Sequence, residues 1–180
     1  HRYQTFKTAL DLMQKRGVKI IVETGTSRDG LKNFEGDGGS SIIFSQYATD
    51  HDAQFFSVDM DQSALNNASI AVQEVLGKLD SKLHFIKSDS IVFLKNFPVA
   101  IDFLYLDSYD YDVNNPNASQ NHHLLEIKAA YPHLTPQSIV MIDDCGLPHG
   151  GKGRLVISYL LGKGWKILEN KYQTILIKQE

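Results

Sequence analysis

The segment 18–27, Val-Lys-Ile-Ile-Val-Glu-Thr-Gly-Thr-Ser, constrains the fold of this chain more than any other stretch. It begins as a β-branched run, which is typical of a strand buried on both faces of a sheet. It ends in an acid, a glycine and small hydroxyl residues, which indicates a tight turn with bare backbone N–H groups. Open α/β sheets bind their ligands at such turns, beyond the carboxyl ends of the strands. We therefore expect a ligand site beside Glu23 and Gly25.

Strand and helix patterns alternate along the rest of the chain. Further strands are expected at 54–58, 83–86, 101–106 and 138–142, and helices at about 3–14, 40–47, 64–76, 90–96, 122–131 and 155–161. Segments 165–168 and 173–177 form a closing hairpin. This alternation implies a parallel sheet with right-handed crossovers. The predicted fold is a Rossmann-like, doubly wound α/β sheet, mostly parallel with an antiparallel C-terminal strand and helices on both faces, in a single domain over 1–180.

Composition excludes several classes of partner. With 18 basic and 21 acidic residues the net charge is −3, and no Lys/Arg stripe predicts binding to nucleic acid or an anionic membrane. The apolar runs are too short to span a bilayer, and the first residues lack a signal-peptide pattern. The single cysteine, Cys145, fits a reducing compartment, so we expect a cytoplasmic protein. Without a nucleic-acid or membrane partner, we expect it to act on a small molecule. The sequence leaves the oligomeric state open.

An acidic residue follows every one of the parallel strands. These residues are Glu23, Asp59, Asp89, Asp107 and the pair Asp143–Asp144. A single acid after a strand is common, because Asp often begins a turn or caps a helix. Acids after all of the strands are informative, because parallel strands end at the same edge of a sheet. We expect the acids to face one crevice.

Two of these strand ends suit a nucleoside. Asp59 stands where a carboxylate can accept both ribose hydroxyls, and Met60 is positioned to pack on an adenine face. Asp89 and Ser90 could bind the exocyclic amine of the adenine. The alternative is that Asp59 and Asp61 only cap the next helix.

The remaining acids suit a hard cation. No Lys or Arg occurs between residues 96 and 127, and adjacent strands would bring Asp107 close to Asp143 and Asp144. Clustered carboxylates repel one another unless a cation joins them. Oxygen ligands without a Cys or His pair favour Mg²⁺ or another divalent ion. The alternative is that these acids pair with Lys152 or Arg154.

Candidates for a general base and for a nucleophile lie in the same loops. His122 is expected to open a helix beside the crevice, and its ordinary pKa suits a general base. Lys152, between two glycines, could hold an anionic substrate or could be a plain surface lysine. Cys145 is interpreted as a small buried thiol rather than a nucleophile.

Four segments together resemble class I S-adenosylmethionine-dependent methyltransferases, over nearly the whole chain. Residues 22–26 resemble the acid-x-Gly turn of that family's first motif, and residues 57–61 resemble its ribose-binding second motif. Residues 104–108 and 140–144 resemble the fourth and fifth strands of metal-dependent O-methyltransferases of the catechol and macrolide-sugar kinds.

The resemblance implies a set of site residues. For S-adenosylmethionine they are Glu23, Gly25, Thr26, Ser41, Asp59, Met60, Asp89, Ser90 and Asp107. For Mg²⁺, which in those enzymes binds two neighbouring substrate hydroxyls, they are Asp107, Asp143 and Asp144.

The sequence departs from the family pattern in two places. Residues 28–38 interrupt the glycine motif, so Gly39, Ser40 and Ser41 must supply the part that normally follows at once. Catechol-type enzymes carry a lysine base near the position of Asp110, and its absence here favours His122 or Asp110 itself as the base.

The sequence thus predicts methyl transfer from S-adenosylmethionine to a hydroxyl of a small molecule, assisted by a divalent metal. A nicotinamide-dependent oxidoreductase is the first alternative, although the chain reads Thr-Ser-Arg after Gly25 and lacks the G-x-G-x-x-G turn. A non-catalytic binding module with the methyltransferase fold is the second.

Overall fold

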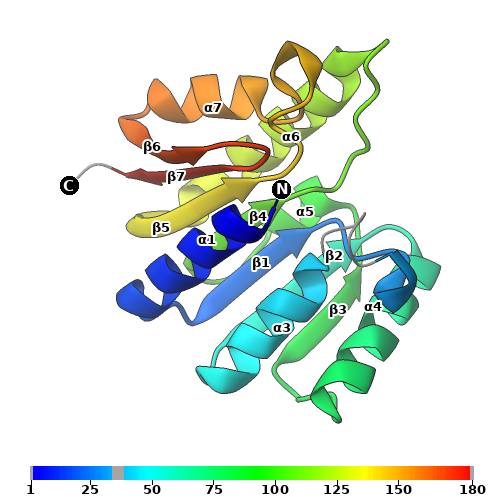
Figure 1. Ribbon diagram of the computed structural model, residues 1–180. Helices are drawn as coiled ribbons and strands as arrows, with labels where there is room; N and C mark the ends of the chain where they lie inside the picture. The colour runs from blue at the N-terminus through cyan, green and yellow to red at the C-terminus, as the bar shows by residue number, and fades with distance from the viewer. Residues whose placement is uncertain (1, 34–38, 179–180) are drawn as a thin grey trace.

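The computed structural model describes residues 2–33 and 39–178. Its centre is a seven-stranded sheet with the order β3-β2-β1-β4-β5-β7-β6 (Figure 1). The strands are β1 (Ile20–Thr24), β2 (Gln54–Asp59), β3 (Leu83–Lys87), β4 (Ile101–Leu106), β5 (Leu134–Ile142), β6 (Trp165–Asn170) and β7 (Thr174–Lys178). The first five are parallel, and β7 runs antiparallel to both β5 and β6. The predicted Rossmann-like architecture is confirmed.

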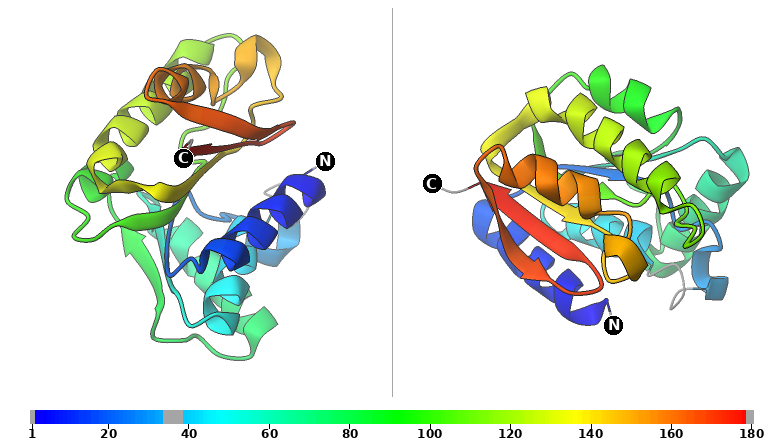
Figure 2. Two further views of the ribbon diagram at one scale, coloured as in Figure 1. Left: turned by 90° about the vertical axis from the view of Figure 1, so that its left-hand side faces the viewer. Right: turned by 90° about the horizontal axis from the view of Figure 1, so that it is seen from above.

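Helices cover both faces of this sheet (Figure 2). On one face lie α1 (Tyr3–Arg16), α3 (Ser40–Asp50) and α4 (Gln62–Leu76), and on the other lie α5 (Ser90–Lys95), α6 (Pro116–Ala130) and α7 (Arg154–Leu161). Short 3₁₀ turns η1 (Gly30–Asn33), η2 (Tyr131–His133) and η3 (Pro148–Gly150) lie in the connections. Within the described ranges, none of the helices has the length and apolar character needed to cross a membrane.

Each face of the sheet packs into its own hydrophobic core. On the α1 side, the buried ring of Phe44 lies 5.0 Å from Phe103 and 5.3 Å from Tyr105, measured between centroids. On the other side, Leu104 and Leu106 of β4 pack against α6 and α7. Because successive strand residues point to opposite faces, a strand buried on both sides needs a run of apolar residues, as β4 has from Phe103 to Leu106.

The strand register brings the carboxyl ends of four strands into line. Thr24 of β1 pairs with Val58 of β2 on one side and with Leu106 of β4 on the other. Leu106 in turn pairs with Ile142 of β5. The residues that follow these strands therefore meet at one edge of the sheet.

Two predicted element starts need correction. α6 begins at Pro116 rather than at His122, because proline suits the first helical position, where its fixed φ fits and its missing N–H is not needed. β5 begins at Leu134 instead of Ser138. α3 begins at Ser40 as expected; Gly39 holds the N-cap position, and the Ser40 hydroxyl donates to Glu23.

The start of α4 and the connection after β1 can also be compared with what the sequence predicted. Asp61 caps α4 as expected, accepting a hydrogen bond from the backbone N–H of Ser63 at 2.8 Å. In the glycine-rich connection after β1, residues 34–38 lie outside the described residues.

Candidate functional site

A small polar cavity lies at the carboxyl edge of the sheet, where the strand-end acids were predicted to meet. Its volume is about 160 Å³, and its lining includes Arg2, Gly25, Thr26, Arg28, Asp59, Asp107, Ser108, Asp110, Asp144 and Lys152. Three described grooves are larger, of about 270, 390 and 750 Å³, and the two largest are mostly apolar in lining. The larger of them includes Ile20, Gln54 and Asp102, so it lies at the opposite edge of the sheet. We therefore place the candidate site at the polar cavity.

The turn after β1 passes unusually close to the end of β4. Gly25 has φ +80°, and a Cβ built on it would lie 2.5 Å from the backbone oxygen of Asp107. Its N–H donates to the carbonyl of Val58 at 2.9 Å, which ties the turn to β2. Only glycine combines this backbone conformation with this close approach. The turn therefore brings bare backbone to the cavity, as predicted.

Glu23 is fully buried directly beneath this turn and accepts three hydroxyl hydrogen bonds. Ser40 donates at 2.5 Å, Ser57 at 2.6 Å and Ser41 at 2.7 Å. Burial raises the pKa of Glu23 to about 7, against the lowering effect of the hydroxyls. Ser41 also lies 3.1 Å from the Thr26 hydroxyl. Glu23 and Ser41 therefore support the cavity from below without appearing in its lining.

Asp59 joins the ends of β1 and β2. Its two carboxylate oxygens accept from the backbone N–H groups of Thr26 at 3.2 Å and of Asp61 at 2.8 Å. Because Asp61 caps α4, the cap does not account for Asp59, which lines the cavity. Each carboxylate oxygen can accept more than one hydrogen bond, so Asp59 retains acceptor capacity for a ligand. Met60 beside it is 67% exposed.

The end of β3 contributes less directly. Asp89 accepts from the backbone N–H of Val92 at 2.9 Å and caps α5. The Ser90 hydroxyl lies 3.3 Å from Nε2 of His122. Neither residue belongs to the described lining of the cavity, so their adenine-binding role stays a prediction.

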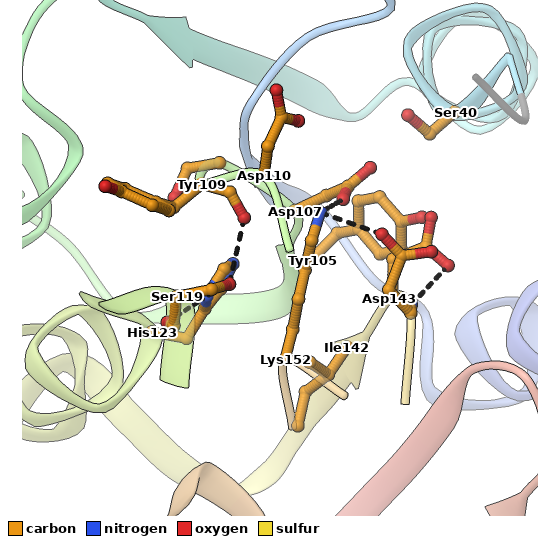
Figure 3. A network of polar contacts seen from close by, with 12 residues as sticks. Ser40, Tyr105, Asp107, Tyr109, Asp110, Ser119, His123, Ile142, Asp143 and Lys152 are labelled. Carbon is orange, nitrogen blue, oxygen red and sulfur yellow. Dashed lines mark hydrogen bonds and ion pairs between the residues drawn. The ribbon is translucent and has the colours of Figure 1, made fainter. Parts of the chain in front are cut away.

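The three acids predicted to bind a metal do lie together, but two cations lie among them. Figure 3 shows one of these cations, Lys152, with Asp107 and Asp143. The Lys152 ammonium pairs with Asp107 and lies 3.1 Å from Oδ2 of Asp144. Nε of Arg2 lies 3.0 Å from Asp143, and its Nη2 lies 3.3 Å from Asp144. Burial alone would lower the pKa of Lys152, but the charges of Asp107 and Asp144 outweigh it and raise that pKa above its usual value.

These ion pairs correspond to the alternative considered for the acids, with Lys152 as one partner. In the described part of the chain, no group of three His, Cys, Asp or Glu side chains is arranged to hold a metal ion. Sequence reasoning missed Arg2 altogether, since nothing marks a lone arginine before a helix. A plain surface lysine was one of the two interpretations of Lys152, whereas Lys152 is only 2% exposed. Gly151 and Gly153, which flank Lys152, were the sequence feature that could have indicated its close packing.

The candidate bases occupy different positions. Asp110 lines the cavity and receives both terminal nitrogens of Arg28, at 2.5 and 2.9 Å, which lowers the pKa of its carboxyl group. This pair joins the β1–α3 connection to the β4–α6 loop. His122 lies in the middle of α6 and is not part of the described lining.

A buried network connects His122 to the edge of the cavity. The Ser108 hydroxyl donates to Glu126 at 2.6 Å, and Nε2 of His122 lies 3.5 Å from the same carboxylate oxygen. Burial favours the neutral acid, but the histidines and Ser108 lower the pKa of Glu126 to about 2. The hydrogen bond to Glu126 raises the pKa of His122, while burial lowers that of His123. Sequence reasoning did not single out Glu126, because it carries no motif.

Cys145 is half-buried rather than fully buried. Burial raises the pKa of the thiol to about 12, which leaves almost no thiolate near neutral pH.

Comparisons with known proteins identify a family for this chain. Residues 35–145, more than half of the chain, match a family described as "Methyltransferase domain". A search of curated proteins found no match.

Several solved structures share the fold. PaMTH1 of Podospora anserina, a methyltransferase solved with SAH bound, has a TM-score of 0.68 at 13% identity, covering 98% of this chain and 78% of its own. The O-methyltransferase NovP has a TM-score of 0.71 at 14% identity, covering 99% and 80%. A putative rRNA methylase from Clostridium thermocellum has a TM-score of 0.65 at 12% identity, covering 96% of each chain. On the strength of the match over residues 35–145, this chain belongs to the methyltransferase domain family and has the fold of S-adenosylmethionine-dependent methyltransferases.

Proposed function

We propose that this protein transfers a methyl group from S-adenosylmethionine to a hydroxyl group of a small molecule. The observation that carries the proposal is the joint placement of Gly25, Thr26 and Asp59 around one cavity, with Glu23 beneath them. Membership of the methyltransferase family supports the cofactor. The likeness to NovP, an O-methyltransferase, supports a hydroxyl acceptor.

In this proposal the cofactor extends along the edge of the sheet. Its methionine part lies against the Gly25–Thr26 turn, which Glu23 and Ser41 support. Asp59 accepts hydrogen bonds from the ribose hydroxyls. The cavity, about 160 Å³, is smaller than the roughly 300–1,000 Å³ of pockets that enclose a whole ligand. The adenine therefore lies outside it, toward the exposed Met60 and the Asp89–Ser90 turn.

The protein's own task is alignment and removal of a proton. The cofactor supplies an already activated methyl group, so the acceptor oxygen has to be held in line with it. A general base must also accept the hydroxyl proton. Of the two predicted bases, Asp110 is better placed, because it lines the cavity while His122 lies behind Ser108 and Glu126.

The Mg²⁺ site predicted from the sequence has weaker support than the cofactor site. Asp107, Asp143 and Asp144 each have a lysine or arginine partner within the described residues. A divalent ion between these acids would have to displace the Lys152 ammonium. The residues present therefore do not fit a bound metal, and we assign no step of the reaction to one.

Titration with S-adenosylhomocysteine by isothermal calorimetry tests the cofactor assignment. We expect binding by the wild type, and a loss of roughly 10- to 100-fold in affinity for Asp59→Asn, because hydrogen bonds to a charged group contribute about 1.5–3 kcal/mol. Asp61→Asn is the matched control, since asparagine caps a helix as well as aspartate does. Its affinity should match the wild type.

The same titration with NADH separates the alternatives. Binding of NADH without binding of S-adenosylhomocysteine would favour the oxidoreductase. Equal affinities for the wild type and Asp59→Asn would remove Asp59 from the site.

A further inference from the structure

We propose that Lys152 is the built-in cation of this site, and that it replaces the divalent metal implied by the resemblance to metal-dependent enzymes. The proposal rests on the proposed methyl transfer, because it names the group that faces the acceptor in that reaction. It makes methyl transfer by this protein independent of metal.

The Lys152 ammonium occupies the place that a bridging ion would need. It pairs with Asp107 at the end of β4, which Figure 3 shows, and lies 3.1 Å from Oδ2 of Asp144 at the end of β5. An ion bridging these two carboxylates would have to occupy the same space. Lys152 is 2% exposed, so the positive charge is held between the acids rather than in solvent.

The backbone of the loop that carries Lys152 is held from two sides, by the residues that follow β5 and by Gln120. A Cβ at Gly151 would overlap the carbonyl oxygen of Asp144, and a Cβ at Gly153 would overlap the sulfur of Cys145. The Gln120 amide donates to the carbonyl of Gly151 at 3.0 Å and to that of His149 at 3.1 Å. The two glycines thus let the loop lie directly on the residues that follow β5.

Two cations, Lys152 and Arg2, balance the charges of the acid cluster. Arg2 neutralises Asp143 and shares Asp144 with Lys152, so each acid of the cluster has a cationic partner. A lysine ammonium has three N–H donors. Two of them are directed to Asp107 and Asp144, and Lys152 also lines the cavity. The third can donate to the acceptor oxygen, which would orient that oxygen and favour its deprotonation.

Manganese binding tests this assignment without a known acceptor. Mn²⁺ is titrated into protein saturated with S-adenosylhomocysteine, and free Mn²⁺ is followed by electron paramagnetic resonance. We expect no stoichiometric binding by the wild type, and an affinity for S-adenosylhomocysteine that a chelator does not change. Lys152→Met removes the charge at similar length, so we expect at least a tenfold gain in Mn²⁺ affinity and a rise in melting temperature with Mn²⁺.

Two further variants serve as controls. Lys152→Arg keeps the charge and should bind no more Mn²⁺ than the wild type. Lys171→Met removes an exposed lysine that pairs only locally with Glu169, and should leave Mn²⁺ binding unchanged.

The outcomes are distinguishable. One Mn²⁺ bound per wild-type chain and lost in Asp107→Asn overturns the proposal, and this measurement does not depend on whether Lys152→Met folds. A folded Lys152→Met protein without any gain in Mn²⁺ affinity also contradicts it. Failure of the wild type to bind S-adenosylhomocysteine would instead refute the proposed function, and Mn²⁺ titration of the protein alone would then still show whether Lys152 excludes a divalent ion.

Discussion

The carboxyl group of Glu23 has no contact with solvent, and among the described residues the hydrogen bonds to it come from the hydroxyl groups of Ser40, Ser41 and Ser57. Burial raises its pKa from 4.5 to about 7. The folded protein therefore holds this proton up to about pH 7, whereas the unfolded chain releases it near pH 4.5. The stability that Glu23 contributes is complete below pH 4.5 and is lost as the pH rises from 4.5 to 7.

Glu23→Gln should abolish this dependence, because glutamine stays neutral and can exchange hydrogen bonds with the same serines. Between pH 4.5 and 7, the free energy of unfolding of the wild type should fall by roughly 2–4 kcal/mol relative to the variant. Urea denaturation at a series of pH values measures both proteins. Parallel curves would contradict a raised pKa at Glu23.

The sequence predicts the positions of the site residues better than it predicts their partners. Glu23, Asp59 and Asp107 could be placed at one edge because strand order and direction alone decide where strands end. The pairing of Arg2 with Asp143 spans 141 residues, and no local pattern encodes such a contact. The burial of Lys152 likewise depends on how a loop packs.

At the scale of elements, the turn between β1 and α3 depends on Gly25. Gly25→Ala should reduce stability for two reasons: φ is +80°, and the new Cβ would press on the backbone of Asp107. The strained φ alone costs about 1–3 kcal/mol, and the contact with backbone adds to it. The shift of the turn should also weaken binding of S-adenosylhomocysteine by at least about tenfold, or 1.4 kcal/mol.

Gly77→Ala is the matched control for this prediction. Gly77 at the end of α4 has φ +74°, but a Cβ added there would meet nothing within 4 Å. It should therefore show the conformational cost alone, with unchanged binding. Equal loss of stability in the two variants, measured by urea denaturation, would show that the close approach at Gly25 is unimportant.

The prediction of elements was better for strands than for helix starts. β1 and β4 could be predicted because each contains an apolar run, Ile20–Val22 and Phe103–Leu106, and burial on both faces requires such runs. The start of α6 was missed because Asn114, Asn115 and Pro116 are typical turn residues. In the structure Pro116 instead occupies the first helical position. His122 was consequently predicted at a helix start facing the crevice, whereas it lies within the helix.

At the scale of the whole molecule, the alternation of strands and helices was enough to predict the sheet and its two covered faces. This follows because a right-handed crossover is nearly obligatory between parallel strands. Structures at 12–14% identity share the same fold, so its specification tolerates wide sequence change. We expect the acceptor to be specified elsewhere, by loops such as 108–115 and 146–153. Gln120 holds the second of these loops through its hydrogen bonds to His149 and Gly151.

The proposed function requires that the strand-end cavity bind S-adenosylmethionine. A crystal structure of the protein soaked with S-adenosylhomocysteine tests it most directly. We predict electron density for the methionine part of the cofactor against the Gly25–Thr26 turn, and for its ribose within hydrogen-bond distance of Asp59. Density at a different part of the surface, or none at a saturating concentration with the cavity open to solvent, would contradict it.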